Sequence, residues 1–377
     1  MNEKIARFLA ERRVETPFLV VDLDVVEENY RALASALPNA KIFYAVKANP
    51  APEILNRLTG LGSNFDTASV VEIEDALAAG ASPSRISYGN TIKKETDIAR
   101  AHALGVRLFA FDSEAELEKI ARAAPGARVF CRILTSGEGA DWPLSRKFGC
   151  EPEMAFDLLL KAAEKGVIPY GISFHVGSQQ RDPQQWDAAI ASCAQLFQDL
   201  EHRGIMLRMV NLGGGFPTRY MKDMPTPADY GQAIDESLRR HFGNRIPETI
   251  VEPGRGMVGN AGVIESEVVL ISRKSATDTK RWVYLDIGKF GGLAETMDEA
   301  IKYPLGFDRE LTAEGESVVL AGPTCDSADV LYEKEEYKLP LDLAIGDRIR
   351  IGSTGAYTTT YSAVAFNGFK PLASYYI

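Results

Sequence analysis

The sequence has few cysteines, and none are arranged for a disulfide framework or a zinc site. Its 377 residues include only four, at positions 131, 150, 193 and 325. No two of them form a Cys-x-x-Cys pair, and no second His or Cys stands at ligand spacing from His175, so we expect no metal site. The Gly-x-Ser-x-Gly, His-Glu-x-x-His and P-loop motifs are also missing. These absences argue against serine-hydrolase, zinc-protease and P-loop chemistry.

Basic residues are also fewer than acidic ones. The chain has 42 basic and 52 acidic side chains, a formal net charge of -10, and no Lys/Arg run. Its mean field repels phosphate, which argues against binding to nucleic acids or anionic membranes. Residues 1–15 form a charged amphipathic stretch without a long apolar core, unlike a signal peptide or a membrane span. We therefore expect a cytoplasmic protein, and the length predicts about two domains.

Short strand-like runs alternate with amphipathic helical patterns from residue 41 onward. The eight runs are 41–46, 63–68, 85–90, 107–112, 127–134, 170–177, 207–215 and 248–255. Strands separated by helices imply a parallel sheet, and eight such units predict a (β/α)8 TIM-type barrel, here over residues 24–260. The alternative is an open doubly wound sheet, which would usually carry a glycine fingerprint in its first turn. That turn instead reads VKANP, which favours the barrel.

The pattern changes after residue 260, where strand-like segments separated by turns replace the helices. The segments are 262–275, 280–288, 316–325, 343–355 and 363–369. They predict a mostly antiparallel β-sandwich or barrel domain formed by residues 1–23 and 261–377. Residues 16–23, TPFLVVDL, are a further strand candidate. This strand either pairs with the C-terminal domain or leads into the barrel.

Unusual polar residues and glycines follow the predicted barrel strands. They are Lys47, Asp66, His175, Gly213, Gly214, Gly215, Glu252, Gly254 and Arg255. In a (β/α)8 barrel all the carboxyl ends of the strands open on one rim, where active sites form. We therefore expect these residues to lie together, and this convergence counts for more than any single motif.

Together these side chains suit one cofactor. A lysine in a low-dielectric pocket can form a Schiff base with an aldehyde. Three glycines at the start of a helix offer N–H groups to a phosphate, with Arg255 as a second contact. Glu252 can pair with a pyridine nitrogen, and the flat His175 can stack on the ring. The combination predicts pyridoxal 5'-phosphate, an electron sink for a carbanion. Each residue also has a plainer alternative. Lys47 could be a surface lysine and the three glycines a simple turn. Arg255 could form a salt bridge at the rim, and His175 could have a structural role.

Eight motifs, in order from about Thr16 to the C-terminus, resemble the fold-type III pyridoxal-phosphate decarboxylases. They read YAVKANP, FDTASVVEIE, FHVGSQ, LGGGFP, VEPGR, CDSAD, GAYT and FNGF. The resemblance is strongest to ornithine decarboxylases, including the bacterial ornithine/lysine group. It implies an alanine racemase-like barrel with a β domain, and decarboxylation of L-ornithine to putrescine, or of L-lysine to cadaverine, in polyamine biosynthesis.

The resemblance also implies a role for each matching residue. Lys47 would form the Schiff base, above a supporting network of Asp66, Glu72 and Arg132, and His175 would stack on the ring. The phosphate would be held by Ser178, Tyr357, Gly213, Gly214, Gly215, Gly254 and Arg255. Glu252 would face the pyridine nitrogen, and Cys325 would direct protonation of the product.

Substrate recognition is implied to use residues of the β domain. Asp326 would bind the distal amine, helped by an acid that falls on Glu299 or its neighbour Asp298, with Phe366 near the dimer boundary. In this family Cys325 and Asp326 act in the partner subunit's site, which implies an obligatory homodimer with shared active sites. Lys147 and Asp329 resemble a salt bridge across that interface.

Three other functions stay open at this point. A meso-diaminopimelate decarboxylase shares the fold and the EPGR motif, but its substrate carries a distal carboxylate and needs an added cation. Alanine racemase places an arginine rather than Glu252 at the pyridine nitrogen. An inactive binding homologue of the antizyme-inhibitor type is disfavoured because Lys47, Glu252 and Cys325 are retained. A buried structural role is the plain alternative for Cys325.

Overall fold

The computed structural model describes residues 3–142 and 147–377, and their contacts divide the chain into two compact units. The barrel unit comprises residues 27–217 and 224–257. The β unit comprises the chain up to residue 26, together with residues 218–223 and 258–377. Residues 218–223 lie within the range predicted for the barrel, yet they join the β unit. One reason is that the Arg219 carbonyl accepts a hydrogen bond of 2.7 Å from the Ser353 hydroxyl.

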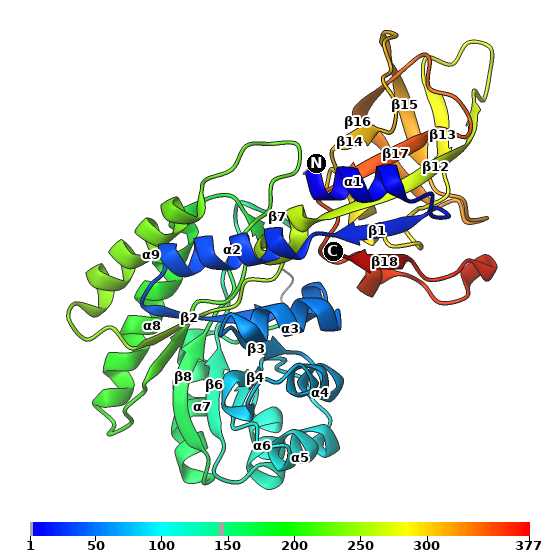
Figure 1. Ribbon diagram of the computed structural model, residues 1–377. Coiled ribbons are helices and arrows are strands. Elements are labelled where there is room, and N and C mark those ends of the chain that lie inside the picture. Colours follow the sequence, from blue (N-terminus) through cyan, green and yellow to red (C-terminus); the bar gives the residue numbers. More distant parts are fainter. Residues whose placement is uncertain (1–2, 143–146) are drawn as a thin grey trace. The chain divides into compact units, whose positions relative to one another are not determined.

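Eight parallel strands close into a barrel, and each of the eight predicted strand positions is confirmed (Figure 1). They are β2 (Ala40–Ala45), β3 (Asn64–Thr67), β4 (Ile86–Tyr88), β5 (Leu108–Phe111), β6 (Arg128–Arg132), β8 (Ile168–Ser173), β10 (Met209–Asn211) and β11 (Glu248–Val251). Neighbours along the chain pair in sequence, and β11 closes the ring on β2. A closed barrel has no edge strands, so the open doubly wound alternative is wrong.

Helices connect the strands, as the alternating pattern predicts. They are α3 (Pro52–Gly60), α4 (Val70–Ala78), α5 (Glu95–Ala103), α6 (Glu114–Ala123), α7 (Pro152–Glu164), α8 (Trp186–Glu201) and α9 (Pro227–Phe242). The short α10 (Arg255–Val258) follows β11, and α2 (Leu23–Ala36) precedes β2. A two-stranded ribbon of β7 (Ala140–Trp142) and β9 (Ser178–Gln180) stands apart from the barrel sheet. No described helix is long and apolar enough to cross a membrane.

Side chains of each strand point alternately into and out of the barrel, and those that point inward fill it with apolar groups. The inner cluster consists of Phe43, Leu108, Ala110, Phe130, Met209 and Ile250, with Tyr170 packed against it. Since successive side chains of a strand point to opposite faces, Phe130 and Arg132 share the inner face of β6, and Cys131 faces the helices. The inside of the barrel is therefore filled with apolar side chains, and polar side chains lie at the carboxyl ends of the strands.

The β unit is built on one eight-stranded sheet of mostly antiparallel pairs, as predicted. Its strands are β1 (Phe18–Val21), β12 (Gly262–Ser272), β13 (Arg281–Leu285), β14 (Leu305–Phe307), β15 (Gly315–Ala321), β16 (Val330–Pro340), β17 (Arg348–Gly352) and β18 (Ala373–Tyr376). Among the described residues of this unit, only β1–β18 and β13–β15 pair in parallel. The segment 16–23 pairs with β12 and β18, so it belongs to this sheet.

One predicted strand of the β unit is wrong, and three strands were not predicted. Residues 363–369 contain the 3-10 helix η7 (Phe366–Gly368), where Ala365 and Asn367 both have positive φ. The left-handed conformation of these residues turns the chain and prevents a strand. The strand β16 was missed because its exposed stretch EKEE lacks apolar alternation. The short β14 and the terminal β18 are equally weak in pattern.

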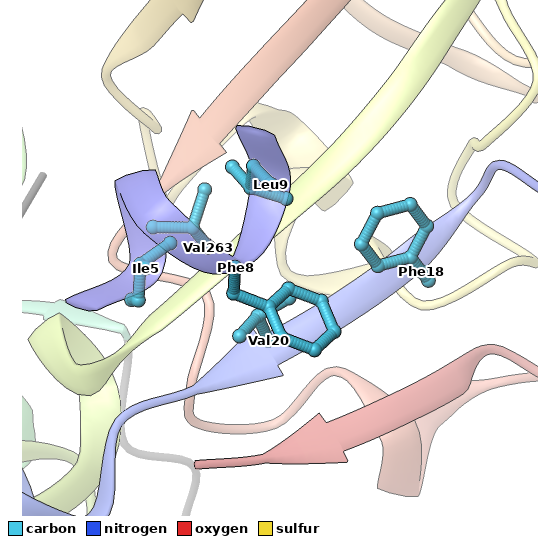
Figure 2. Packing of buried hydrophobic residues seen from close by; sticks show 6 residues of the cluster. All are labelled: Ile5, Phe8, Leu9, Phe18, Val20 and Val263. Atoms are coloured by element: carbon cyan, nitrogen blue, oxygen red, sulfur yellow. The ribbon is translucent and has the colours of Figure 1, made fainter. Parts of the chain in front are cut away.

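The N-terminal stretch folds into the helix α1 (Glu3–Glu11), which covers one face of the β unit's sheet. Figure 2 shows Ile5, Phe8 and Leu9 of this helix packed with Phe18, Val20 and Val263 of the strands. All six side chains are buried, while the charged residues of the helix face outward. The amphipathic pattern of residues 1–15 therefore serves packing within the β unit.

Candidate active site

The barrel brings the predicted rim residues together at the carboxyl ends of its strands. Lys47 lies in the 3-10 helix η1 (Val46–Ala48), directly after β2. Asp66 is the third residue of β3, and Arg132 is the last residue of β6. The other rim residues follow β8, β10 and β11, and they are His175, Gly213, Gly214, Gly215, Glu252, Gly254 and Arg255. Because all eight strands are parallel, these positions share one rim, as the sequence predicts.

The Lys47 ammonium acts on three acidic groups of the site. Burial, and next the negative charge of Glu252, raise the pKa of Asp66 well above its usual range, while the charge of Lys47 opposes this shift. Burial also raises the pKa of Glu252 and of Glu72, and Lys47 again opposes the shift in each case. One lysine acts on three buried carboxyl groups, so all four side chains occupy one electrostatic environment.

The Asp66 carboxylate is fixed by the next strand and its loop. Its Oδ1 accepts a hydrogen bond of 3.1 Å from the Ser87 hydroxyl. Gly89 presses against the same carboxylate, since a β-carbon at this position would stand 1.9 Å from Oδ1. Neither Ser87 nor Gly89 was predicted as a site residue. The sequence signal that could have identified them is a serine and a glycine on either side of Tyr88, the last residue of β4.

The Glu252 carboxylate is oriented by Asn211, which the sequence reasoning missed. The Asn211 side-chain amide donates to Glu252 Oε1, and its Oδ1 accepts from the Gly213 N–H at 2.9 Å. The Glu252 N–H in turn donates to the Gly213 carbonyl at 2.8 Å. A buried asparagine at the end of the apolar strand β10 was the signal that could have found this residue.

The Glu72 side chain has a second task at the start of α4. Its carboxylate accepts from the Ala68 N–H at 2.6 Å, and its own N–H donates to the Ser69 hydroxyl at 3.2 Å. This arrangement is close to a capping box, which satisfies amide groups at the first turn of a helix. Glu72 therefore fixes the turn after Asp66 as well as contributing charge near Lys47.

The His175 ring is neutral and held in one orientation. Its Nδ1 accepts a hydrogen bond of 2.9 Å from the Gly177 N–H, which leaves the proton on Nε2. Burial, and then the positive charges of Arg132 and Lys47, lower its pKa well below the usual range. A flat neutral ring held by its own loop suits stacking better than metal binding. Among the described residues, no group of three or more His, Cys, Asp or Glu could hold a metal ion.

The three glycines do not begin a helix, so that expectation is wrong. The next helix after them, α9, starts only at Pro227. The glycines are needed because neighbouring backbone crowds them: a β-carbon would lie 2.1 Å from the Phe174 carbonyl oxygen at Gly213 and 2.6 Å from the Gly177 oxygen at Gly215. In the part of the chain described, the Gly214 and Gly215 N–H groups donate to no protein acceptor. These two amides can therefore donate hydrogen bonds to a bound anion.

Ser178 and Arg255, both predicted to hold phosphate, lie together in the barrel unit. The Arg255 guanidinium donates to the Ser178 hydroxyl from Nε at 3.3 Å and from Nη2 at 3.2 Å. Arg255 is buried, with 3% of its surface exposed. A buried guanidinium oriented by a hydroxyl is suited to binding an oxyanion.

Lys47 and Arg132 differ in exposure. Lys47 is exposed in the single chain, so the expectation of a low-dielectric pocket around it is wrong for this chain by itself. Burial lowers the pKa of Arg132, against the charges of Glu252, Asp112 and Asp66. The Arg132 guanidinium also lies over the Phe148 ring, 5.2 Å from its centroid. Arg132 is thus a partly exposed cation that the barrel desolvates, Arg255 is the buried one, and Lys47 is the accessible one.

The predicted residues of the β unit form a second group. Cys325 and Asp326 are exposed, so the alternative of a buried structural thiol at position 325 is wrong. The Cys325 N–H donates to Asn367 Oδ1 at 2.9 Å, next to Phe366. Phe366 packs on Phe290 with ring centroids 4.9 Å apart. The CDSAD and FNGF motifs, 42 residues apart, therefore meet on the surface of this unit.

Glu299 and Asp298 have different surroundings within the β unit. Both have positive φ, in the 3-10 helix η5 (Ala294–Glu299). The Glu299 carboxylate accepts three backbone N–H groups at 2.6–2.8 Å, those of Glu333, Lys334 and Glu335. Asp298 is exposed. Glu299 therefore anchors η5 to β16, and Asp298 is the acid left facing solvent.

Two further predicted residues lie in the β unit. Tyr357 has a positive φ and packs on Tyr361, with ring centroids 5.7 Å apart. Asp329 is buried, and its carboxylate accepts from the Lys289 N–H and from the N–H and hydroxyl of Thr324. Its own unit thus supplies three hydrogen-bond donors to the carboxylate predicted to pair with Lys147.

Comparisons with known proteins show the family of the chain. The family described as pyridoxal-dependent decarboxylase, pyridoxal binding domain, matches residues 23–259. A lysine/ornithine decarboxylase of Selenomonas ruminantium is 38% identical over 374 residues, which cover 98% of this chain and 91% of the relative. The chain belongs to the pyridoxal-dependent decarboxylases.

Solved structures of this decarboxylase family share the fold over the whole chain. The structure of SrLDC in complex with PLP and cadaverine is 36% identical, with a TM-score of 0.89, and the match covers 100% of this chain and 94% of that one. The Paramecium bursaria Chlorella virus arginine decarboxylase bound to agmatine is 30% identical, with a TM-score of 0.90 and both chains covered fully. The chain is therefore a fold-type III amino-acid decarboxylase that uses pyridoxal phosphate.

The rim of this decarboxylase fits the cofactor. The free Gly214 and Gly215 amides and the buried Arg255 supply donors for a phosphate. Burial raises the pKa values of Asp66 and Glu252, so a cationic ring beside these two carboxyl groups would stabilise their charged forms. Bound pyridoxal phosphate supplies an electron sink for the bond-breaking step.

Proposed function

We propose that the chain decarboxylates L-ornithine to putrescine and L-lysine to cadaverine, as a step of polyamine biosynthesis. The observation that carries this proposal is the 38% identity to a lysine/ornithine decarboxylase over 98% of the chain. The cadaverine and agmatine in two structural relatives support a basic amino acid as the substrate class.

The barrel residues take the roles of cofactor binding and activation. Lys47, the accessible cation, would hold the cofactor's aldehyde, above Asp66, Glu72 and Arg132. Glu252 would keep a proton on the pyridine nitrogen, because a buried carboxylate oriented by Asn211 favours a neighbouring cation. The neutral His175 would lie on the ring face. The phosphate would be held by Ser178, Gly213, Gly214, Gly215, Gly254, Arg255 and Tyr357.

The β unit takes the role of substrate recognition and product protonation. Cys325 would hold the proton for the product carbon, and Asp326 would bind the distal ammonium. Asp298 is the second acid that we propose for this ammonium, since three backbone amides already occupy the Glu299 carboxylate. Phe366 would line the dimer boundary. Both exposed motifs would act in the partner's site, so the active form would be a homodimer.

The chemistry of the distal group distinguishes this proposal from its rivals. Two carboxylates facing a distal ammonium gain from a charge-assisted hydrogen bond at each one. The distal carboxylate of meso-diaminopimelate would instead face like charge at Asp326 and Asp298. An inactive binding homologue would have no need of Lys47, Glu252 and an exposed Cys325.

Product analysis tests the proposal. The purified protein, supplied with pyridoxal phosphate, is incubated separately with ornithine, lysine, arginine and meso-diaminopimelate, and CO2 and amine products are measured. We expect putrescine and cadaverine, with a preference of at most about 200-fold, because one methylene contributes only about 1–3 kcal/mol in a pocket. Conversion of diaminopimelate alone would overturn the substrate assignment. Absence of CO2 with all four substrates would favour the binding homologue.

A further inference from the structure

Two cysteine thiols that the proposed function does not use lie in contact inside the barrel unit. The Sγ atoms of Cys131 and Cys150 are 3.7 Å apart, and both residues are buried, with 0% and 5% of their surface exposed. Cys131 lies on the outer face of β6, and Cys150 lies two residues before the start of α7. They stand 19 residues apart in the chain, and the fold brings the two sulfurs together.

The backbone holds this contact in place. The Cys150 N–H donates to the Arg132 carbonyl at 3.0 Å, and the Leu134 N–H donates to the Cys150 carbonyl at 2.9 Å. Cys150 and Ile133 thereby form a parallel bridge that extends β6 beyond its end. Gly149 permits the approach, since a β-carbon there would stand 2.9 Å from the Ile133 carbonyl carbon.

We propose that Cys131 and Cys150 are a modification site, at which a hydroperoxide converts the two thiols into a disulfide bond. An S–S bond of about 2.05 Å requires the sulfurs to approach by about 1.7 Å, which side-chain rotation and a small shift at residue 150 can supply. The matched pair of backbone hydrogen bonds keeps both sulfurs within reach while they rotate.

The two thiols have different parts in this reaction. Burial, and then the contact with Cys150, raise the pKa of Cys131 well above its usual range, so Cys131 stays a thiol. Cys150, with 5% of its surface exposed against 0% for Cys131, is the more accessible of the two buried thiols and meets the peroxide. Its thiolate attacks a peroxide oxygen: an S–O bond forms, the O–O bond breaks, and the leaving oxygen takes a proton as water or an alcohol. The Cys131 sulfur then attacks the Cys150 sulfur, the S–S bond forms, and the expelled hydroxide takes the Cys131 proton.

The disulfide would act on the active site through Arg132. This residue follows Cys131 on β6, its side chain lies on the opposite, inner face, and its carbonyl is the acceptor for Cys150. The Cys150 thiol itself lies 3.6 Å from the same carbonyl oxygen. Pulling Cys131 outward therefore shifts the backbone of Arg132, whose charge acts on Glu252 and His175. A displacement of about 1 Å at such a position costs up to ~100-fold in turnover.

Thiol mapping tests the modification without relying on the proposed function. The protein is treated with hydrogen peroxide, at a dose raised until the exposed Cys325 is oxidised, and is then alkylated in denaturant and digested. Mass spectrometry should find a peptide that links Cys131 to Cys150 and separates on reduction. It should be present in wild type and in Cys193→Ala, which removes a buried thiol elsewhere, and absent in Cys150→Ala. Finding both thiols alkylated in wild type, with Cys325 already oxidised, would overturn the proposal.

A second measurement tests the link to Arg132, and it rests on the decarboxylase activity. Wild type and Cys150→Ala are compared after the same peroxide treatment, each before and after dithiothreitol. We expect wild type to lose activity that dithiothreitol restores, beyond any loss shared with Cys150→Ala. Equal losses in the two proteins, with the linked peptide present, would show that the disulfide forms without acting on the site.

Discussion

Gly89 lies so close to Asp66 that a single added methyl group would collide with the carboxylate. A β-carbon at residue 89 would stand 1.9 Å from Asp66 Oδ1 and 2.9 Å from its carboxyl carbon. The glycine therefore sets the position of a buried acid that shares its electrostatic environment with Lys47 and Glu252. A residue with no side chain thus shapes the candidate site.

The first prediction follows from this contact. Gly89→Ala should displace the Asp66 carboxylate and lower kcat by roughly 10- to 100-fold at saturating cofactor, because small displacements at a reacting site are costly. Gly60→Ala is the matched control, since a β-carbon there meets nothing within 4 Å. Steady-state kinetics and thermal unfolding of both variants check the prediction. Wild-type kcat in a folded Gly89→Ala protein would show that the placement of Asp66 does not matter.

The charge of Glu252 should affect turnover more than cofactor affinity. Glu252→Gln keeps an acceptor for the Asn211 amide but removes the negative charge. We expect kcat to fall by about 100- to 1000-fold, as when a preorganised electrostatic contact is removed from a transition state. Cofactor affinity should change little because the phosphate contacts supply most of it. Equilibrium dialysis and kinetics, with the exposed Glu53→Gln as control, separate the two effects. Lost affinity with normal turnover would contradict the assignment.

Glu299 and Asp298 should respond differently to substitution. Glu299→Ala leaves three amide groups of β16 without their acceptor and should lower the free energy of unfolding by about 1–2 kcal/mol. Asp298→Asn, which removes the charge but suits the positive φ of this residue, should leave stability unchanged and raise KM for the basic substrate. Denaturant unfolding and steady-state kinetics on the two variants make the comparison. A raised KM in Glu299→Ala with unchanged stability would reverse the two roles.

Lys93 should give the stability of the barrel unit a distinct pH dependence. Its buried ammonium contacts the carbonyls of Asn90 and Ala110 and the Glu116 carboxylate at 2.6–3.0 Å. Burial outweighs the attraction of Glu116 and lowers the pKa of Lys93 from 10.5 to about 8. Between pH 8 and 10.5 the unfolded chain thus binds more protons at this residue than the folded chain does, so stability rises with pH in that window.

This contribution can be measured against Lys93→Met. The difference in free energy of unfolding, wild type minus variant, should rise between pH 8 and 10.5, by at most ~3 kcal/mol. Lys94→Met, at the exposed neighbouring position, should show no such rise. A difference that falls with pH would mean that the ion pair with Glu116 holds the ammonium charged in the folded protein.

Complementation tests the shared site of the proposed homodimer. Lys47→Ala and Cys325→Ala should each be nearly inactive, and Lys47→Ala should lose the visible absorption of bound cofactor. In mixed dimers with shared sites, one site carries both lesions and the other is intact. Random pairing makes about half of the dimers mixed, so activity should return to roughly a quarter of wild type. No recovery despite demonstrated subunit exchange would place each complete site within one chain.

The barrel and its rim could be predicted because they depend on local patterns. Strand–helix alternation identified all eight barrel strands, and the position of a residue after a strand placed it on the rim. Lys47, Glu252 and Arg255 were identified in this way. The family resemblance added the β-unit residues, such as Cys325, which no local pattern in that unit marks as functional. The structure places Cys325 on an exposed surface beside the FNGF loop.

The tertiary structure decided which segments far apart in the chain come into contact. Periodicity identifies which residues begin a rim loop, but not that Asn211 orients Glu252 or that Gly89 confines Asp66. The glycine triplet was read as a helix start, and its actual cause is crowding by the carbonyl oxygens of adjacent loops. The different surroundings of Asp298 and Glu299 likewise depend on the amides of β16, more than thirty residues away. The sequence by itself determined the architecture and the chemical types at the rim, because secondary-structure periodicity is local. Partners, tautomers and exposure required the fold, because they depend on packing across the chain.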